Sequence, residues 1–376
     1  MAKTKESKTG KLNIRSLDFV LLTTTLVLLA LGIITVLSAS APRALETSGN
    51  SLDYFEKQTG FAAIGIVVMI VLTVVDYHKY QKHYLGIYVL SIIALLTVVV
   101  FGREVNGAKR WIYLGSVSIQ PSELAKIGLI IFYAGFLTQN KNKIKNFGGG
   151  FIVPLLYLVP IVAILFFGQN HLSAAVIMIA LAVILMFLAG SKLRYFILVG
   201  LPLAVSAVLV LIARGGFRLQ RMLTFLDPWA NPTGTGWQIV QGQIAIGSGG
   251  LFGVGIGQSV QKYLYISEPQ NDFIFAIIAE ELGFIGCAVV IILFGVLIWR
   301  GLVISMKAPD MFGRLTAAGV TSMIAIQVII NIGVVTSLLP VTGMALPLFS
   351  YGGTSLIIIL ASIGILLNIS RQINKS

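Results

Sequence analysis

Two ionisable residues lie close together in a segment that is otherwise apolar. Glu123 and Lys126 are three positions apart, so in a helix they share one face. Pro121 suits the first turn of that helix, which places Glu123 at the positive end of the helix dipole. Two interpretations stay open. Either the dipole stabilises Glu123 while Lys126 extends to the surface, or both residues line a polar cavity.

A second group of acids begins at Asp272. Asp is a favoured N-cap residue, so Asp272 is interpreted either as a helix cap or as a chemical group. Glu280 and Glu281 follow in an apolar run, about 12 Å further along a helix that rises 1.5 Å per residue. A charge at bilayer depth costs at least about 2.5–3.5 kcal/mol. At least one of the two glutamates must therefore face the protein interior, paired with a base or kept protonated by burial.

Several basic residues near these acids suit an anionic ligand. Lys109 and Arg110 precede the Glu123 segment, whereas Arg218 and Arg221 lie upstream of Asp272. Arg binds phosphate oxygens bidentately, so this group favours a lipid diphosphate at the membrane surface. The three histidines show no metal-site spacing, and the single cysteine excludes an internal disulfide.

The elements that must position these residues are membrane helices. The chain has 376 residues, of which 57% are hydrophobic and 11% charged, whereas a soluble domain carries about 25% charged residues. A membrane-spanning helix needs roughly 20 apolar residues. Ten segments approach or meet that length: 17–39, 59–75, 83–101, 121–138, 151–168, 172–189, 194–213, 272–299, 314–338 and 345–368. We therefore predict an all-α integral membrane protein of about ten spans.

The basic residues predict the orientation of these spans. Most of the 27 Lys and Arg residues fall in segments that are cytoplasmic if the N-terminus is inside, as the bias of cytoplasmic loops requires. We predict cytoplasmic tails at 1–16 and 369–376 around one membrane domain at 17–368, with both termini in the cytoplasm. The net charge of +13 is dispersed rather than clustered, which argues against nucleic acid as a partner.

One connection is much longer than the others. Residues 214–271 join the seventh and eighth predicted spans on the outer side, and loops beyond about 12–15 residues are usually functional or disordered. This one is rich in apolar residues, which argues against disorder. A glycine-rich run at 247–257 permits a re-entrant turn, but it lacks the strand and helix context of a nucleotide site. We expect short amphipathic helices resting on the outer leaflet and folded back over a cavity.

A series of motifs resembles the SEDS family (shape, elongation, division and sporulation), and most closely its FtsW and SpoVE branch. The motifs occur in order along the chain: NGAKRW at 106–111, QPSELAK at 120–126, RMLTFLDP at 221–228, NDFIFA at 271–276, EELG at 280–283, PVTG at 340–343 and SYGG at 350–353. The resemblance implies a peptidoglycan glycosyltransferase that polymerises lipid II outside the membrane, for division or sporulation. It also implies a class B penicillin-binding protein as partner, besides membrane lipid and other divisome or sporulation proteins.

The resemblance implies roles for three residues, but it implies none for the hairpin after the fifth predicted span. It makes Asp272 essential to catalysis and places Glu123 and Lys126 in the same cavity. The family commonly reads Gln-Pro-Asp-Leu-Gly after the fifth span, whereas this chain has Gln-Asn-His-Leu-Ser at 169–173. A carboxylate is missing there, and no role is carried onto that hairpin.

The expected reaction needs a base for the attacking hydroxyl and cations for the departing diphosphate. Asp272 is the predicted base. The predicted substrate-binding residues are Glu123, Lys126, Lys109, Arg110, Arg218, Arg221, Glu280 and Glu281. No protein metal site is predicted, although a divalent cation, Mg²⁺ or Mn²⁺, stays open as a substitute for part of the cationic set. The alternative functions are a lipid II flippase, which intramembrane acids also suit, and a scaffold that only recruits the transpeptidase.

Overall fold

The computed structural model describes residues 17–105, 107–115, 117–202, 224–263 and 265–373. Within them, eight helical stretches are long and apolar enough to cross a membrane. These are α1 (Phe19–Ser48), α2 (Asp53–Val74), α4 (Tyr84–Phe101), the continuous stretch Gly148–Gly168, α7 (Leu172–Ala189), α12 (Ile274–Lys307), α13 (Met311–Val335) and α14 (Gly353–Ile373). The prediction of an all-α, multi-pass membrane protein is confirmed.

The remaining helical elements are shorter or more polar. The stretch Gly148–Gly168 consists of η3 (Gly148–Ile152), α6 (Val153–Ala163) and η4 (Ile164–Gly168). The others are α3 (His78–Lys82), α5 (Pro121–Gln139), η2 (Lys141–Lys143), α8 (Leu193–Tyr195), η5 (Phe196–Gly200), η6 (Pro228–Ala230) and α11 (Trp237–Gly249).

The predicted number of ten spans is not tested fully. The fourth predicted span coincides with α5, which carries Glu123 and Lys126 and is not one of the eight most apolar helices. The seventh, at 194–213, lies partly outside the described residues, as do the tail at 1–16 and the first part of the loop at 214–271. The count therefore stays a prediction.

Several predicted boundaries differ from the structure: α1 extends to Ser48 instead of 39, α2 begins at Asp53 instead of 59, and α12 ends at Lys307 instead of 299. Two further differences lie together at one end of the bundle. The tenth predicted span, 345–368, is replaced by α14, which begins only at Gly353, because residues 346–352 form turns. The eighth begins at Ile274, with Phe273 as its N-cap residue and no side-chain cap. Asp272 therefore lies before the cap, and its interpretation as a helix cap is wrong.

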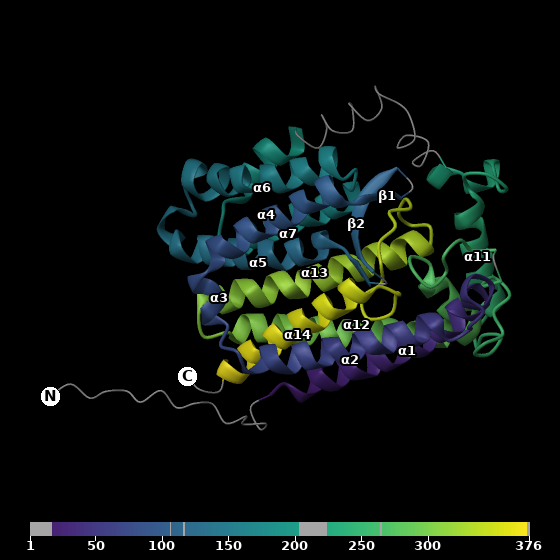
Figure 1. The fold of residues 1–376 in the computed structure, drawn as a ribbon. Helices are drawn as coiled ribbons and strands as arrows, with labels where there is room; N and C mark the ends of the chain where they lie inside the picture. Colours follow the sequence, from purple (N-terminus) through teal and green to yellow (C-terminus); the bar gives the residue numbers. More distant parts are fainter. Residues whose placement is uncertain (1–16, 106, 116, 203–223, 264, 374–376) are drawn as a thin grey trace.

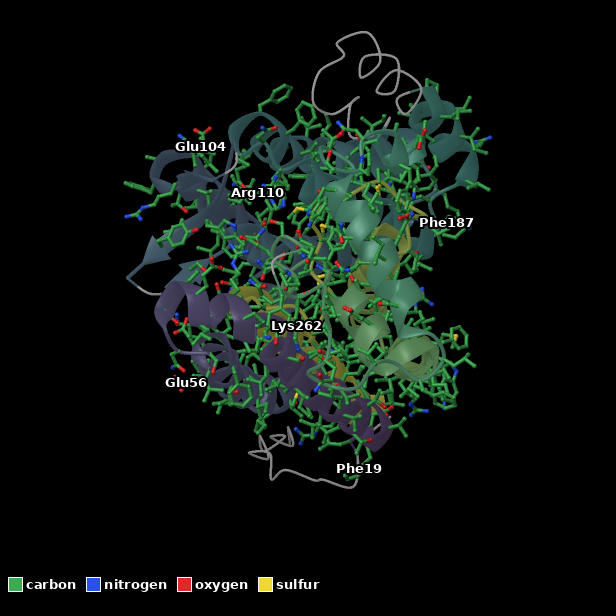
Figure 2. All side chains as sticks on the ribbon, turned by 90° about the vertical axis from the view of Figure 1, so that its right-hand side faces the viewer. Phe19, Glu56, Glu104, Arg110, Phe187 and Lys262 are labelled. Atoms are coloured by element: carbon green, nitrogen blue, oxygen red, sulfur yellow. The ribbon has the colours of Figure 1, made fainter. Side chains whose placement is uncertain are left out.

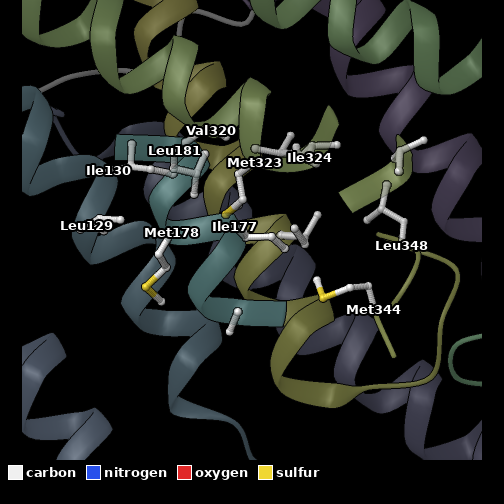
Figure 3. Packing of buried hydrophobic residues seen from close by; sticks show 14 of the residues in the cluster. Leu129, Ile130, Ile177, Met178, Leu181, Val320, Met323, Ile324, Met344 and Leu348 are labelled. Atoms are coloured by element: carbon white, nitrogen blue, oxygen red, sulfur yellow. The ribbon is translucent and has the colours of Figure 1, made fainter. Parts of the chain in front are cut away.

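The helices pack side by side, with α5, α13 and α14 between α4, α6 and α7 on one flank and α1, α2 and α12 on the other (Figure 1). The inner position of α13 and α14 agrees with their burial, which is the highest among the eight spans. Figure 3 shows buried side chains of α5, α7 and α13 packed into one apolar core. Outward residues of the outer helices, such as Leu90 and Val100, are exposed and apolar, as a lipid-facing surface requires.

The first described residues and the last turns of α14 lie at one end of the bundle (Figure 1). Asp18, which caps α1, pairs there with Arg300 near the end of α12. The opposite end carries α11 and a small antiparallel sheet, which the sequence analysis did not predict. Its strands are β1 (Arg103–Val105), β2 (Ala108–Leu114) and β3 (Val117–Ile119), in the order β1-β2-β3.

Candidate active site

Glu123 and Lys126 form an ion pair at the head of α5. Lys126 Nζ lies 2.8 Å from Glu123 Oε1, and both side chains are buried. Pro121 occupies the first turn, as predicted, so Glu123 lies where the helix dipole favours an anion. Only 1% of Lys126 is exposed, which excludes the interpretation that its ammonium extends to the surface. The pair is turned into the protein.

The head of α14 supports this pair from the other side. Ser355 Oγ donates to Glu123 Oε2 at 3.2 Å. Thr354 Oγ1 donates to the Ser118 carbonyl at 2.9 Å and accepts from the Gln120 backbone at 3.3 Å. The start of α14 is thereby fixed to the strand and turn that lead into α5.

The hairpin between Gly168 and Leu172 contributes a third wall. It joins η4 to α7 in a tight turn, in which Asn170 adopts a positive φ of 51°. His171 is 5% exposed, and its backbone N–H donates to the Leu165 carbonyl at 2.8 Å. Burial and the positive charges of Arg110 and Lys126 lower the pKa of His171 to about 3. The ring is therefore neutral at physiological pH, and it lies in the field of both cations.

Arg110 reaches this hairpin from β2. Its Nη2 donates to the Asn170 carbonyl at 3.4 Å, and Asn170 Nδ2 donates to the Gly107 carbonyl at 3.0 Å. Figure 2, which views this end of the bundle, shows Arg110 nearer the centre and Glu104 at the rim. Arg110, Glu123, Lys126 and His171 are called the α5 cluster below.

Asp272 is held by backbone contacts between α12, α13 and the turns before α14. Asn331 of α13 is buried, and its Nδ2 donates to the carbonyls of Asp272 at 2.9 Å and Met344 at 2.6 Å. Ser350 Oγ donates to the Asn271 carbonyl at 2.6 Å. The Tyr351 backbone donates to the carbonyl of Gln270 at 2.8 Å. The segment 344–351 therefore fixes the backbone on which Asp272 stands.

Gly343 lies directly beside the Asp272 carboxyl group. A Cβ atom added to Gly343 would be 3.2 Å from Asp272 Oδ2, and its φ of +66° is a conformation that favours glycine. One residue earlier, the Thr342 carbonyl accepts a hydrogen bond from Ser173 Oγ at 2.7 Å. Thr342 and Gly343 thus connect Asp272 to the hairpin that carries His171.

Glu280 and Glu281 are buried, as predicted, but they serve a different group of contacts. Glu280 accepts hydrogen bonds from Ser259 Oγ and the Val260 backbone, and Glu281 pairs with Lys262 Nζ at 3.0 Å. Ser38 of α1 donates to Glu281 at 2.6 Å. Ser38, Ser259, Lys262, Glu280 and Glu281 are called the α12 cluster.

The backbone around the α12 cluster explains why the two glutamates are there. α12 is broken at Gly283, where φ is 65° and ψ is −165°. Val254 and Gly255 donate to the carbonyls of Glu280 and Glu281, while Phe284 donates to the carbonyl of Gly250. The glycine-rich run thus satisfies the backbone groups that the break leaves open. A cavity of about 410 Å³, lined mainly by apolar residues of α1 and of 256–263, adjoins this cluster and not Asp272.

The structure says less about the other predicted site residues. Lys109 lies on β2 beside Arg110. Arg218 and Arg221 lie outside the described residues. Two further acids of the long loop have structural contacts: Glu268 pairs with Arg43 at 3.2 Å, and Asp227 caps η6. Sequence reasoning missed Asn331, although a lone Asn in an apolar span is itself a signal.

The model of the FtsW, RodA and SpoVE family of cell cycle proteins matches residues 19–375. Stage V sporulation protein E of Bacillus subtilis (strain 168) is 43% identical over 356 residues, covering 94% of this chain and 97% of that protein. A probable peptidoglycan glycosyltransferase FtsW of Geobacter sp. (strain M18) is 38% identical, with coverage of 94% and 97%.

Solved structures share the fold along nearly the whole chain. A chain of a peptidoglycan synthase complex that coordinates polymerization and crosslinking superposes with a TM-score of 0.78 at 27% identity, covering 96% of this chain and 99% of that one. The rod shape determining protein RodA of Thermus thermophilus superposes with a TM-score of 0.70 at 28% identity, with coverage of 95% and 97%.

Proposed function

The chain belongs to the FtsW, RodA and SpoVE family of cell cycle proteins, and from that premise we propose that it is a peptidoglycan glycosyltransferase that polymerises lipid II. One observation supports a single site: Thr342 and Gly343 bring the Asp272 carboxyl group next to the hairpin of the α5 cluster. With the predicted orientation and both termini in the cytoplasm, this site faces outward.

The proposed reaction divides the work between the two halves of the site. The 4-hydroxyl oxygen of one lipid-linked sugar forms a bond to the anomeric carbon of another. The bond from that carbon to the diphosphate oxygen breaks, and the leaving diphosphate takes the electron pair. Asp272 accepts the hydroxyl proton and later passes it to water.

Cations stabilise the leaving group in this proposal. Lys126 and Arg110 lie on the hairpin side of the site, and preorganised charge of this kind is often the largest catalytic contribution. Lys109, the residue before Arg110 on β2, stays a further candidate. Arg218 and Arg221 stay candidates for the same role. Glu123 orients Lys126, whereas the contacts of Glu280 and Glu281 favour a role in holding the loop.

The described residues contain no group of three or more His, Cys, Asp or Glu side chains that could hold a metal ion. The side chains in the described part of the chain therefore do not fit a metal ion that is bound by protein ligands alone. Mg²⁺ is commonly held by one or two carboxylates together with substrate phosphates. An ion shared with the diphosphate therefore stays a prediction, and no step is derived through it.

The partner is proposed from the same family membership. Superposition on a chain of a synthase complex that couples polymerization to crosslinking supports a class B penicillin-binding protein as the transpeptidase. Other divisome or sporulation proteins stay predictions. The similarity to a sporulation protein and to FtsW proteins supports a role in septum synthesis.

The test uses the purified full chain in liposomes with lipid II, with and without the candidate transpeptidase. A polymerase lengthens glycan chains when lipid II is supplied on one face only. If labelled lipid II instead crosses the bilayer and no polymer forms under any condition, the flippase alternative replaces the proposal.

A further inference from the structure

His171 is a buried side chain with an incomplete set of contacts. Its Nδ1 has no hydrogen-bond partner among the described residues, although 5% of the residue is exposed. Its backbone N–H donates a hydrogen bond to the Leu165 carbonyl, and its backbone carbonyl accepts one from the Ala175 N–H. The position of the ring is thus determined by the hairpin, while a buried polar atom is left unpaired at a cost in free energy.

Two further polar atoms are unpaired on neighbouring walls. Ser122 Oγ adjoins Glu123 at the head of α5, and Thr342 Oγ1 adjoins Gly343 in the segment that contacts Asp272. Neither has a hydrogen-bond partner within the described part of the chain. Native proteins pair most buried polar groups, so unpaired atoms on adjoining walls indicate a ligand or water.

The charge around His171 indicates which ligand. The positive charges of Arg110 on β2 and Lys126 on α5 are near enough to lower the pKa of His171, and Glu123 neutralises part of the Lys126 charge. Within the described residues, Glu123 occupies one of the three donors of the Lys126 ammonium. The surroundings therefore favour an anion with several acceptor oxygens.

We propose that His171 is a substrate-binding residue whose neutral ring donates its Nδ1–H to a phosphate oxygen of the lipid-linked diphosphate. Ser122 and Thr342 supply hydroxyl donors to the same group. The identity of the diphosphate rests on the proposed function, whereas the anion site itself rests on the contacts above.

A neutral donor has a different effect from a third cation. Arg110 and Lys126 supply the attraction, and further charge on His171 is opposed by both of them. A ring N–H adds direction, because a hydrogen bond weakens steeply as its angle departs from linearity. His171 would thus orient the diphosphate that the two cations attract.

The first experiment measures polymerisation kinetics of His171→Leu and His171→Asn. Leu removes the donor, whereas the Asn amide places an N–H near the position of Nδ1. We expect His171→Leu to raise KM about tenfold or more with kcat within about threefold, and His171→Asn to restore most of the loss. His83→Leu, an exposed site, is the matched control. An unchanged KM in folded His171→Leu would overturn the proposal.

The second experiment does not depend on catalysis. The chain has three histidines, so isotope-labelled imidazoles can be followed by NMR and assigned by single replacement. Farnesyl diphosphate and inorganic diphosphate should both shift the His171 signal, and farnesol should not. The Asp272→Ala protein should show the same shift while it forms no polymer. A His171 signal indifferent to both diphosphates overturns the inference even if the protein polymerises lipid II, whereas a shift without polymerisation removes only the proposed function.

Discussion

The α5 cluster and the α12 cluster both hold buried acids and bases, with Arg110 half-buried in the first, yet their hydrogen bonding differs. In the α12 cluster Lys262 Nζ has three acceptors, which are Ser38 Oγ, the Gly257 carbonyl and Glu281 Oε1. An ammonium has three donors, so this charge is fully satisfied. A fully satisfied buried network of this kind rigidifies the structure around it.

The α5 cluster is left incomplete. Among the described residues, Lys126 has Glu123 as its ion-pair partner, and polar atoms of Ser122, His171 and Thr342 are unpaired nearby. The two clusters have similar composition and burial, so residue types alone would not separate them. Hydrogen-bond saturation is therefore the feature that separates the ion pair of the α12 cluster from the proposed substrate site at the α5 cluster.

Lys262→Met should have the largest effect on stability, because it removes the cation of the α12 cluster. This change leaves Glu281 buried without its ion pair, and removing one partner of a buried pair typically costs about 3–5 kcal/mol. Thermal unfolding in detergent should show a large loss of stability, and any loss of activity should follow the loss of folded protein. A variant with unchanged melting would show that the α12 cluster is not structural.

Lys126→Gln, in contrast to Lys262→Met, should lower activity strongly and stability only slightly. Removing one preorganised charge at a leaving group lowers kcat/KM by about 10²–10³-fold, or roughly 3–4 kcal/mol. The stability loss should be smaller than for Lys262→Met, because the α5 dipole and Ser355 still support Glu123. Kinetics and melting of the two variants are measured side by side. A large stability loss with normal kcat/KM in the folded fraction contradicts the assignment.

The pH dependence of stability should report His171. Its pKa is about 3 in the folded protein against an ordinary value of 6.5, so between these values the unfolded chain binds a proton that the folded protein does not. Stability should therefore fall as pH decreases from 6.5 towards 3, by up to about 2 kcal/mol at pH 5. In His171→Leu, the melting temperature should depend less on pH over this range. An equal slope in both proteins contradicts a neutral buried His171.

Gly343→Ala should have the smallest of these effects. An L-residue at φ +66° costs about 1–2 kcal/mol, and the added Cβ would lie 3.2 Å from Asp272 Oδ2. We expect a modest drop in melting temperature and a larger loss of kcat, because the carboxyl group must shift. Gly107→Ala, also at positive φ but with open space around it, is the control for backbone strain.

Local patterns predicted much of this molecule. Apolar runs gave the spans, and the three-residue spacing of Glu123 and Lys126 correctly placed both side chains on one helix face. The hydrogen bonds that assemble the site, in contrast, join residues that are far apart in the sequence. Asn331 bridges Asp272 and Met344, and Ser173 meets Thr342, across long stretches of chain. Periodicity indicates which face of a helix is polar, but it does not indicate which distant loop will contact that face.

The break in α12 shows the same limit. A long apolar run predicts a continuous helix, and the EELG motif gave no sign that Gly283 adopts a positive φ. The break is stabilised by backbone groups of residues 250–255, which a helical pattern does not report. The sequence pattern therefore places Glu280 and Glu281 with the substrate-binding residues, whereas their contacts are with the long loop and with Ser38 of α1.

The most direct measurement is lipid II polymerisation by Asp272→Asn beside wild type and Glu104→Gln, an exposed acid at the rim of the same end. Asn keeps the size of the side chain and removes its basicity. We expect a loss of at least about 100-fold in rate for Asp272→Asn, with normal melting, and wild-type rates for Glu104→Gln. Wild-type polymerisation by folded Asp272→Asn would contradict the assignment of Asp272 as the catalytic base.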